Sequence, residues 1–219
     1  IAAQIARTKD YARRHYLPRG KSQRGRRGKQ GGSSVHHIQH RVSIEKRPAK
    51  AETRQQPGHW EADLMLFSRY GQAVLTLHER RTRLTAVVPL ASKAAEPLAQ
   101  TLKALLAPLP AHLRRTLTFD NGTEFAQHYT LHQPLKIKTF FCDPHAPWQK
   151  GGIENANGRL RRFLPRKTDL NTLTALDFRQ IALLYNHTPR KCLGFKTPAE
   201  AFAKLLHFKC ESTFPPARE

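Results

Sequence analysis

The order of its strand-like and helix-like segments restricts the fold of this chain more than any other feature. Three short apolar segments follow one another closely, at residues 58–67, 72–77 and 83–90. Gly71 lies between the first two and marks a turn. Short strands joined by brief connections favour an antiparallel meander. We therefore expect the folded part of the chain to begin with three antiparallel strands.

The segments that follow alternate between helix and strand. Residues 92–106 space Leu and Ala as an amphipathic helix does, and Ser92 is the expected N-cap. Further strands are expected at 117–120 and 135–141, and further helices at 123–128, 149–163, 173–186 and 198–207. This order predicts an α/β fold, with a mixed five-stranded sheet and helices on both of its faces.

The balance of charge indicates a polyanionic partner. Lys and Arg number 38 and Asp and Glu 16, which gives a formal net charge of +22. Such a field attracts polyanions, and nucleic acid is the expected partner. A ribosomal or other scaffold protein would show the same excess, so the charge alone does not identify an activity.

The positive charge is most concentrated near the start of the chain, where we expect a largely flexible basic arm. Residues 19–34 contain no sizeable apolar side chain, so this stretch cannot bury enough surface to offset its ordering entropy. Arg26 and Arg27 within it are expected DNA contacts, although a merely solvated tail would have the same composition. The three expected regions are the basic arm (1–46), the folded core (47–207) and a C-terminal tail (208–219).

Cysteine content and hydropathy limit the compartment. The three cysteines, Cys142, Cys192 and Cys210, are odd in number and form no CxxC pair, which is typical of a reduced intracellular protein. No apolar run approaches the ~20 residues of a membrane span. The chain begins with Ile1 rather than Met, so we expect it to be part of a longer protein.

Three acidic residues fall at positions where the expected elements can bring them together. Asp63 lies in the first strand, Asp120 at the end of the fourth, and Glu154 in the first half of a helix. If the first and fourth strands are neighbours, three carboxylates converge and repel one another unless a cation joins them. Mg²⁺ or Mn²⁺ fits such an all-oxygen site. Spacing alone leaves alternatives: Glu61 and Glu124 compete as ligands.

Asp120 also has a simpler explanation. It stands directly before Asn-Gly, where an aspartate often serves as a turn residue.

The two tryptophans, Trp60 and Trp148, are expected in the core or in the wall of a site, with base stacking by Trp148 as the alternative.

Longer blocks around these acids resemble a known family. They are G-H-W-E-A-D (58–63), F-D-N-G-T-E-F (119–125) and A-P-W-Q-K-G-G-I-E-N-A-N-G-R-L-R-R-F-L-P (146–165). All three are similar to the integrase-like catalytic core of bacterial DDE transposases, and most of all to the insertion-sequence-thirty family. The segment 186–202 is similar to that family's tail, so the resemblance covers about residues 42–202.

This resemblance implies both a fold and a chemistry. The fold is ribonuclease H-like, and Asp63, Asp120 and Glu154 are the metal-binding catalytic triad. The 33 residues between Asp120 and Glu154 agree with the family's spacing. The implied activity is Mg²⁺-dependent cleavage and strand transfer of DNA, with Mn²⁺ able to substitute. The implied partners are transposon ends, target DNA and further copies of the chain, in the bacterial cytoplasm at the nucleoid.

Several residues near Glu154 are expected to contact DNA. Arg161 follows Glu154 by seven positions, so it lies on nearly the same helical face and is similar to the family's basic residue there. Lys150, Arg159 and Asn155 are further candidates, and a solvated helix face is the alternative for all of them.

Two other functions remain open at this point. A ribonuclease H-like nuclease that cleaves without strand transfer would share the acids and the metal. A non-catalytic basic DNA-binding remnant would explain the charge but gives no reason for three placed carboxylates.

Overall fold

The computed structural model describes residues 38–67, 71–144 and 146–207. The chain divides into two compact units, 1–32 and 33–219, and all the described residues belong to the second. Most of the expected basic arm, with Arg26 and Arg27, therefore lies outside the described residues, as does the expected tail.

The five strands form one mixed sheet, as the sequence predicts. They are β1 (His59–Leu66), β2 (Ala73–Glu79), β3 (Thr85–Leu90), β4 (Thr116–Phe119) and β5 (Lys138–Phe141). Their order across the sheet is β3-β2-β1-β4-β5. The first three pair antiparallel, whereas β4 runs parallel to β1 and β5 parallel to β4. This is the arrangement expected of a ribonuclease H-like core.

Some helices connect strands, and others come after the last strand in the chain. The α-helices are α2 (Ala49–Glu52), α3 (Ala95–Leu106), α4 (His132–Leu135), α5 (Gly151–Leu160), α6 (Ala175–Asn186) and α7 (Pro198–His207). Short 3-10 turns occupy Ile44–Lys46, Ala111–Leu113, Thr123–Phe125, His128–Leu131, Pro147–Lys150, Leu170–Thr172 and Lys191–Leu193.

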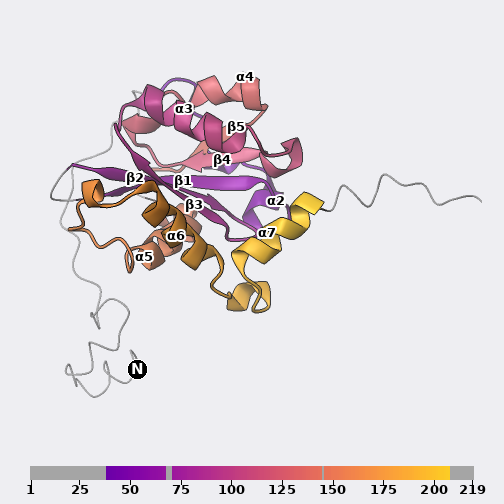
Figure 1. The fold of residues 1–219 in the computed structure, drawn as a ribbon. Helices are drawn as coiled ribbons and strands as arrows, with labels where there is room; N and C mark the ends of the chain where they lie inside the picture. Colours follow the sequence, from indigo (N-terminus) through magenta and orange to yellow (C-terminus); the bar gives the residue numbers. More distant parts are fainter. Residues whose placement is uncertain (1–37, 68–70, 145, 208–219) are drawn as a thin grey trace, which may run out of the picture. The chain divides into compact units, whose positions relative to one another are not determined.

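Alternation along the strands divides the core into two clusters. On β1, Trp60 and Ala62 face one cluster, which also holds buried leucines of α3. Met65 faces the second cluster, which holds Ala156 of α5 and Phe178 of α6. Because successive strand residues point to opposite faces, helices must cover both sides of the sheet. Figure 1 shows α3 on one side and α5 and α6 on the other.

Helix α3 begins three residues later than its sequence predicts. Its N-cap is Ala94, and the Ser92 hydroxyl instead accepts a hydrogen bond from the Ala94 amide at 3.1 Å. Pro97 explains the shift. A helix capped by Ser92 would need an amide hydrogen at Pro97, whereas in the observed helix Pro97 falls in the first turn, where amides have no intrahelical acceptor.

The last strand is also shorter than expected. Residues 132–135 form α4, and Lys136 ends it with a left-handed backbone (φ 52°). That conformation cannot continue into a strand, so β5 starts only at Lys138. Leu131 and Leu135 lie four residues apart and are both buried, as one face of a helical turn allows. The helix expected at 123–128 is likewise replaced by two 3-10 turns.

Gly58 lets the start of β1 approach the segment before β4. Its φ is +89°, and its carbonyl accepts the Arg115 amide at 2.7 Å. A Cβ at this position would lie 2.5 Å from the carbonyl oxygen of His112, which is closer than real Cβ atoms come. Only glycine combines this backbone with this contact.

We predict that Gly58→Ala is much more destabilising than Gly71→Ala. Both glycines have positive φ, but a Cβ at Gly71 would meet nothing within 4 Å. Backbone strain alone should cost about 1 kcal/mol at Gly71, and strain plus overpacking about 3 kcal/mol at Gly58. Urea unfolding of the two variants measures the difference. Equal losses would show that the close approach at Gly58 relaxes freely.

Candidate active site

Parallel pairing of β1 with β4 brings two aspartates to the same level of the sheet. Glu61 of β1 pairs with Thr118 of β4. Asp63 and Asp120 each lie two residues further along, so both side chains belong to the sheet face that α5 covers. The sequence argument required the first and fourth strands to be neighbours, and in the sheet they are.

Lys150 joins the two aspartates. It ends the 3-10 turn before α5, and its side chain is only 8% exposed. Its Nζ lies 3.1 Å from Asp63 Oδ1 and 3.2 Å from Asp120 Oδ2. A single cationic group is therefore shared by two carboxylates, and both aspartates lie within reach of one positive ion.

The charges in this cluster do not balance. Two carboxylates face one ammonium. Burial raises the pKa of the Asp63 carboxyl; Lys150 opposes this effect, and the nearby Asp120 charge adds to it. Burial alone would lower the pKa of Lys150, but the two aspartates outweigh burial and raise it. Lys150 thus stays protonated, and the cluster can accept additional positive charge.

Asp120 has two roles in the structure. Its Oδ1 accepts the Gly122 amide at 3.1 Å, which is the turn interaction that Asp-Asn-Gly predicts. Its Oδ2 faces Lys150. The next residue, Asn121, donates to the Cys142 carbonyl at 2.8 Å and accepts from Arg41 at 2.9 Å, which ties the end of β4 to that of β5. The turn therefore fixes the carboxylate while leaving one oxygen available.

Helix α5 contributes a further polar side chain to the cluster. Asn157 Nδ2 donates to Asp63 Oδ2 at 2.7 Å, and Asp63 is therefore held from both of its oxygens. Lys150, Glu154 and Asn157 are spaced four and three residues apart, so they share one face of the helix. Glu154 is half-buried on this face, between two residues that touch Asp63.

The structure brings together two of the three expected acids. In the described part of the chain, no three His, Cys, Asp or Glu side chains lie close enough to hold a metal ion. Glu124 is a fourth carboxyl in the neighbourhood: burial raises its pKa, and the charges of Asp120 and Asp63 raise it further. Glu124 therefore stands near the aspartate pair, whereas Glu154 lies on the α5 face that carries Asn157.

Glu61 has a structural use. It is completely buried, its Oε1 is paired with Arg80, and its Oε2 accepts the Ile153 amide at 2.9 Å. These bonds attach the first turn of α5 to the centre of β1. Its carboxylate is thus already occupied on both oxygens.

The expected DNA contacts differ in their surroundings. Arg161 is half-buried: it donates to the Leu66 carbonyl at 2.8 Å and lies over the Phe67 ring, and burial lowers its pKa. Arg159 and Asn155 are exposed and bonded to each other at 3.0 Å. Lys150 is buried among carboxylates. Contact with DNA stays a prediction for all four.

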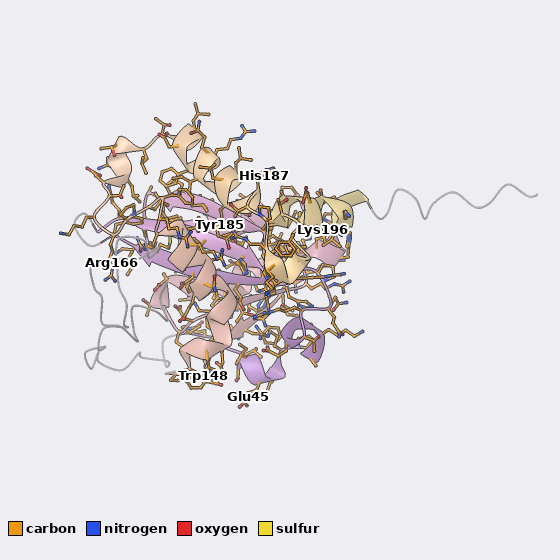
Figure 2. The ribbon with its side chains drawn as sticks, turned by 90° about the horizontal axis from the view of Figure 1, so that it is seen from below. Glu45, Trp148, Arg166, Tyr185, His187 and Lys196 are labelled. Atoms are coloured by element: carbon orange, nitrogen blue, oxygen red, sulfur yellow. The ribbon has the colours of Figure 1, made fainter. Side chains whose placement is uncertain are left out.

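The two tryptophans differ in burial. Trp60 is buried in the core, as predicted. Trp148 is 74% exposed, so it is not a core residue, while a place in the wall of a site or in base stacking stays a prediction. In Figure 2 it lies at the outer edge of the ribbon, two residues before Lys150.

The bridging role of Lys150 is the functional feature that the sequence interpretation missed. Lysine is rarely buried, so a DNA contact was the natural expectation. The spacing contained a usable signal, because Lys150 precedes Glu154 by four residues and therefore points to the same side. Its pairing with two acidic side chains follows from that position.

Comparison with known proteins adds independent information. No protein-family model matches the chain. Over 165 residues, 75% of this chain, it is 39% identical to the transposase for insertion sequence element IS1086 of Cupriavidus metallidurans, covering 49% of that protein. Over 188 residues, 86% of this chain, it is 36% identical to the transposase of insertion sequence element IS30A of Escherichia coli, covering 48% of that protein.

A third relative extends the pattern. The chain is 34% identical over 194 residues, 89% of its length, to the transposase for insertion sequence element IS4351 of Bacteroides fragilis, covering 56% of that protein. Among the described residues, no helix is both long and apolar enough to cross a membrane. The chain spans about half the length of the curated relatives it matches. Over most of its own length, the chain is therefore similar to IS30-family transposases of insertion sequences.

Proposed function

We propose that this chain is the catalytic core of a transposase, which cleaves DNA strands and joins them to a target with the help of a divalent metal ion. The observation that carries the proposal is the pair Asp63 and Asp120, whose carboxylates share one cation on the sheet face below α5. The three relatives are named as transposases of insertion sequence elements, which supports this class of reaction.

The donor set fits a hard divalent ion. Asp63 and Asp120 offer oxygen ligands, and the excess of negative over positive charge favours a second cation. We assign metal binding to these two residues and to Glu154, with Mg²⁺ as the physiological ion and Mn²⁺ as a substitute. A metal bound there would lower the pKa of a water nucleophile and neutralise charge on the scissile phosphate.

The chain's own residues keep the ligands in place. Asn157 fixes one oxygen of Asp63, and the Gly122 amide fixes one oxygen of Asp120. This limits the reorganisation that metal binding requires. Lys150 supplies the balancing charge, and its flexible side chain can turn toward a DNA phosphate when the metal takes over that role.

The whole reaction requires more than this core. The proposed partners are transposon ends and target DNA, with two or more copies of the chain holding the ends together in the bacterial cytoplasm. The main alternative, a nuclease without strand transfer, would use the same carboxylates. Joining a 3′-hydroxyl oligonucleotide to plasmid DNA separates the two, because a simple nuclease yields cleaved plasmid only.

We expect Asp120→Asn to abolish Mg²⁺-dependent plasmid nicking while the protein stays folded. The amide keeps the acceptor for Gly122 but loses the charge that holds a cation. The rate should fall by about 10³-fold or more. Glu96→Gln, an exposed acid on α3, is the matched control and should nick normally. Nicking at the wild-type rate by folded Asp120→Asn would refute the carboxylate site.

The third ligand can be decided by comparing two glutamates. We expect Glu154→Gln to lose nicking and Glu124→Gln to retain it, because Glu154 shares the helix face of Asn157 and Lys150. Rates measured in Mg²⁺ and in Mn²⁺ make the comparison. The reverse result, activity in Glu154→Gln and none in Glu124→Gln, would transfer the ligand role to Glu124.

Replacing Lys150 should tighten metal binding. In Lys150→Met the aspartates lose their ammonium, so a divalent ion no longer competes with a charge only 3.1–3.2 Å from its ligands. We expect Mg²⁺ affinity to rise by about tenfold or more in calorimetry without DNA. Lys103→Met, on exposed α3 surface, serves as the charge-matched control. Unchanged affinity in folded Lys150→Met would mean that the ammonium and the metal occupy different positions.

A further inference from the structure

A polar cavity lies beside α5, away from the aspartates. Its volume is about 230 Å³, and four arginines line it: Arg54, Arg83, Arg159 and Arg190. They come from four separate segments, namely the loop before β1, the β2–β3 turn, α5 and the turn after α6. The fold therefore gathers positive charge here from residues distant in the sequence.

No acidic residue lines this cavity. Within the described ranges, every ion pair involves other cations, and none involves these four arginines. Burial lowers the pKa of Arg54, and the neighbouring charges of Arg83 and Arg80 lower it further. Four guanidinium groups around one small space repel one another, and an anion placed among them would remove that repulsion.

Arg190 is held rigidly without a carboxylate. It is buried, its guanidinium donates to the Tyr185 carbonyl at 2.9 Å, and it stacks over the Tyr185 ring at 4.5 Å. Tyr185, labelled in Figure 2, also lines the cavity. An ordered guanidinium whose charge is not neutralised is a prepared donor for an oxyanion.

An unpartnered buried nitrogen also faces this cavity. His78 is 1% exposed and lines the cavity, and its Nδ1 lies 2.8 Å from the Thr85 hydroxyl. Its Nε2 has no hydrogen-bond partner. Burial and the surrounding arginines lower the pKa of His78 to about 3, so the ring is neutral. The Thr85 hydroxyl has two acceptors within reach, His78 Nδ1 and the Arg83 carbonyl at 3.2 Å. Only when it donates to Nδ1 does the His78 proton sit on Nε2.

Gly152 keeps this nitrogen accessible. A Cβ there would lie 3.5 Å from His78 Nε2 and 2.8 Å from the Glu61 carboxylate. Gly151, Asn155 and Arg159 stand at four-residue intervals on the cavity side of α5, whereas Lys150 and Asn157 lie on the aspartate side. The helix thus separates the two sites.

We propose that this cavity is a phosphate-binding site, which takes the tetrahedral oxyanion between its arginines. The phosphate is either a phosphodiester of a DNA strand or a free phosphate. Arg54 and Arg159 are exposed at its rim, so a strand on the surface can reach it. Binding of a DNA phosphate rests on the proposed function. It would hold the DNA strand at a second point, on the side of α5 opposite the aspartates.

Cys192 provides a local reporter. It is an exposed thiol lining the cavity, whereas Cys142 is buried and burial raises its pKa to about 12. In a full-length Cys210→Ser background, iodoacetamide should therefore alkylate Cys192 selectively. The rate is measured in EDTA with duplex DNA, with inorganic phosphate, or with chloride at equal ionic strength.

A bound phosphate should protect this thiol. At a ligand concentration about ten times Kd the rate should fall about tenfold, because only unliganded protein reacts. Arg83→Gln should weaken phosphate affinity about tenfold, which leaves only about twofold protection, and lower the salt slope of DNA binding by about 1. Arg179→Gln, an equal charge change at an exposed position of α6, should keep full protection. Arg54→Gln, in an exposed loop, replaces Arg83→Gln if that variant misfolds.

Each result decides the proposal. Protection by DNA that Arg83→Gln weakens and Arg179→Gln keeps supports a strand phosphate, and the same pattern with inorganic phosphate supports a free phosphate. Equal protection in both variants, or protection by neither ligand, overturns the site. Because EDTA removes divalent metal, the ligands should protect Cys192 in Asp120→Asn to the same extent as in the wild-type chain. A failed metal site therefore cannot be mistaken for a failed phosphate site.

Discussion

The parallel pairing of β1 with β4 is the contact on which the rest of the molecule depends. It joins segments separated by a hairpin, a third strand and α3, so the chain must close a long loop to form it. Trp60, Leu117 and their neighbours offset that cost by burial against α3. Once formed, the pairing fixes the ends of both strands, and thus the relative positions of Asp63 and Asp120.

Helix α5 depends on this pairing and extends it in two directions. Glu61 attaches the first turn of the helix to β1, and Ala156 and Leu160 bury it against the sheet. One of its flanks then faces the aspartates and the other faces the arginine-lined cavity. The weak helix-forming pair Gly151-Gly152 becomes understandable here, since a side chain at Gly152 would press on Glu61.

Much of this arrangement was predictable from local pattern. The five strands, their order along the chain and the mixed sheet follow from apolar periodicity and from the turns between the segments, whereas the adjacency of Asp63 and Asp120 needed the pairing of β1 with β4. The start of α3 was predictable too, had Pro97 been weighed against Ser92. The spacing to Glu154 indicated the side on which Lys150 lies, but its burial was not predictable, because burial of a lysine depends on partners that only tertiary contacts supply. The same reason hid the cavity, whose four arginines are far apart in the sequence and meet only in the folded chain.

The ammonium of Lys150 has a consequence for how this protein is made. A pair of half-buried carboxylates with no counter-ion would make the core unstable until an external cation arrived. Because Lys150 already supplies a cation, the stability of this core does not have to wait for a metal ion. In the proposed function, a divalent ion would replace one positive group by another, without a change of fold.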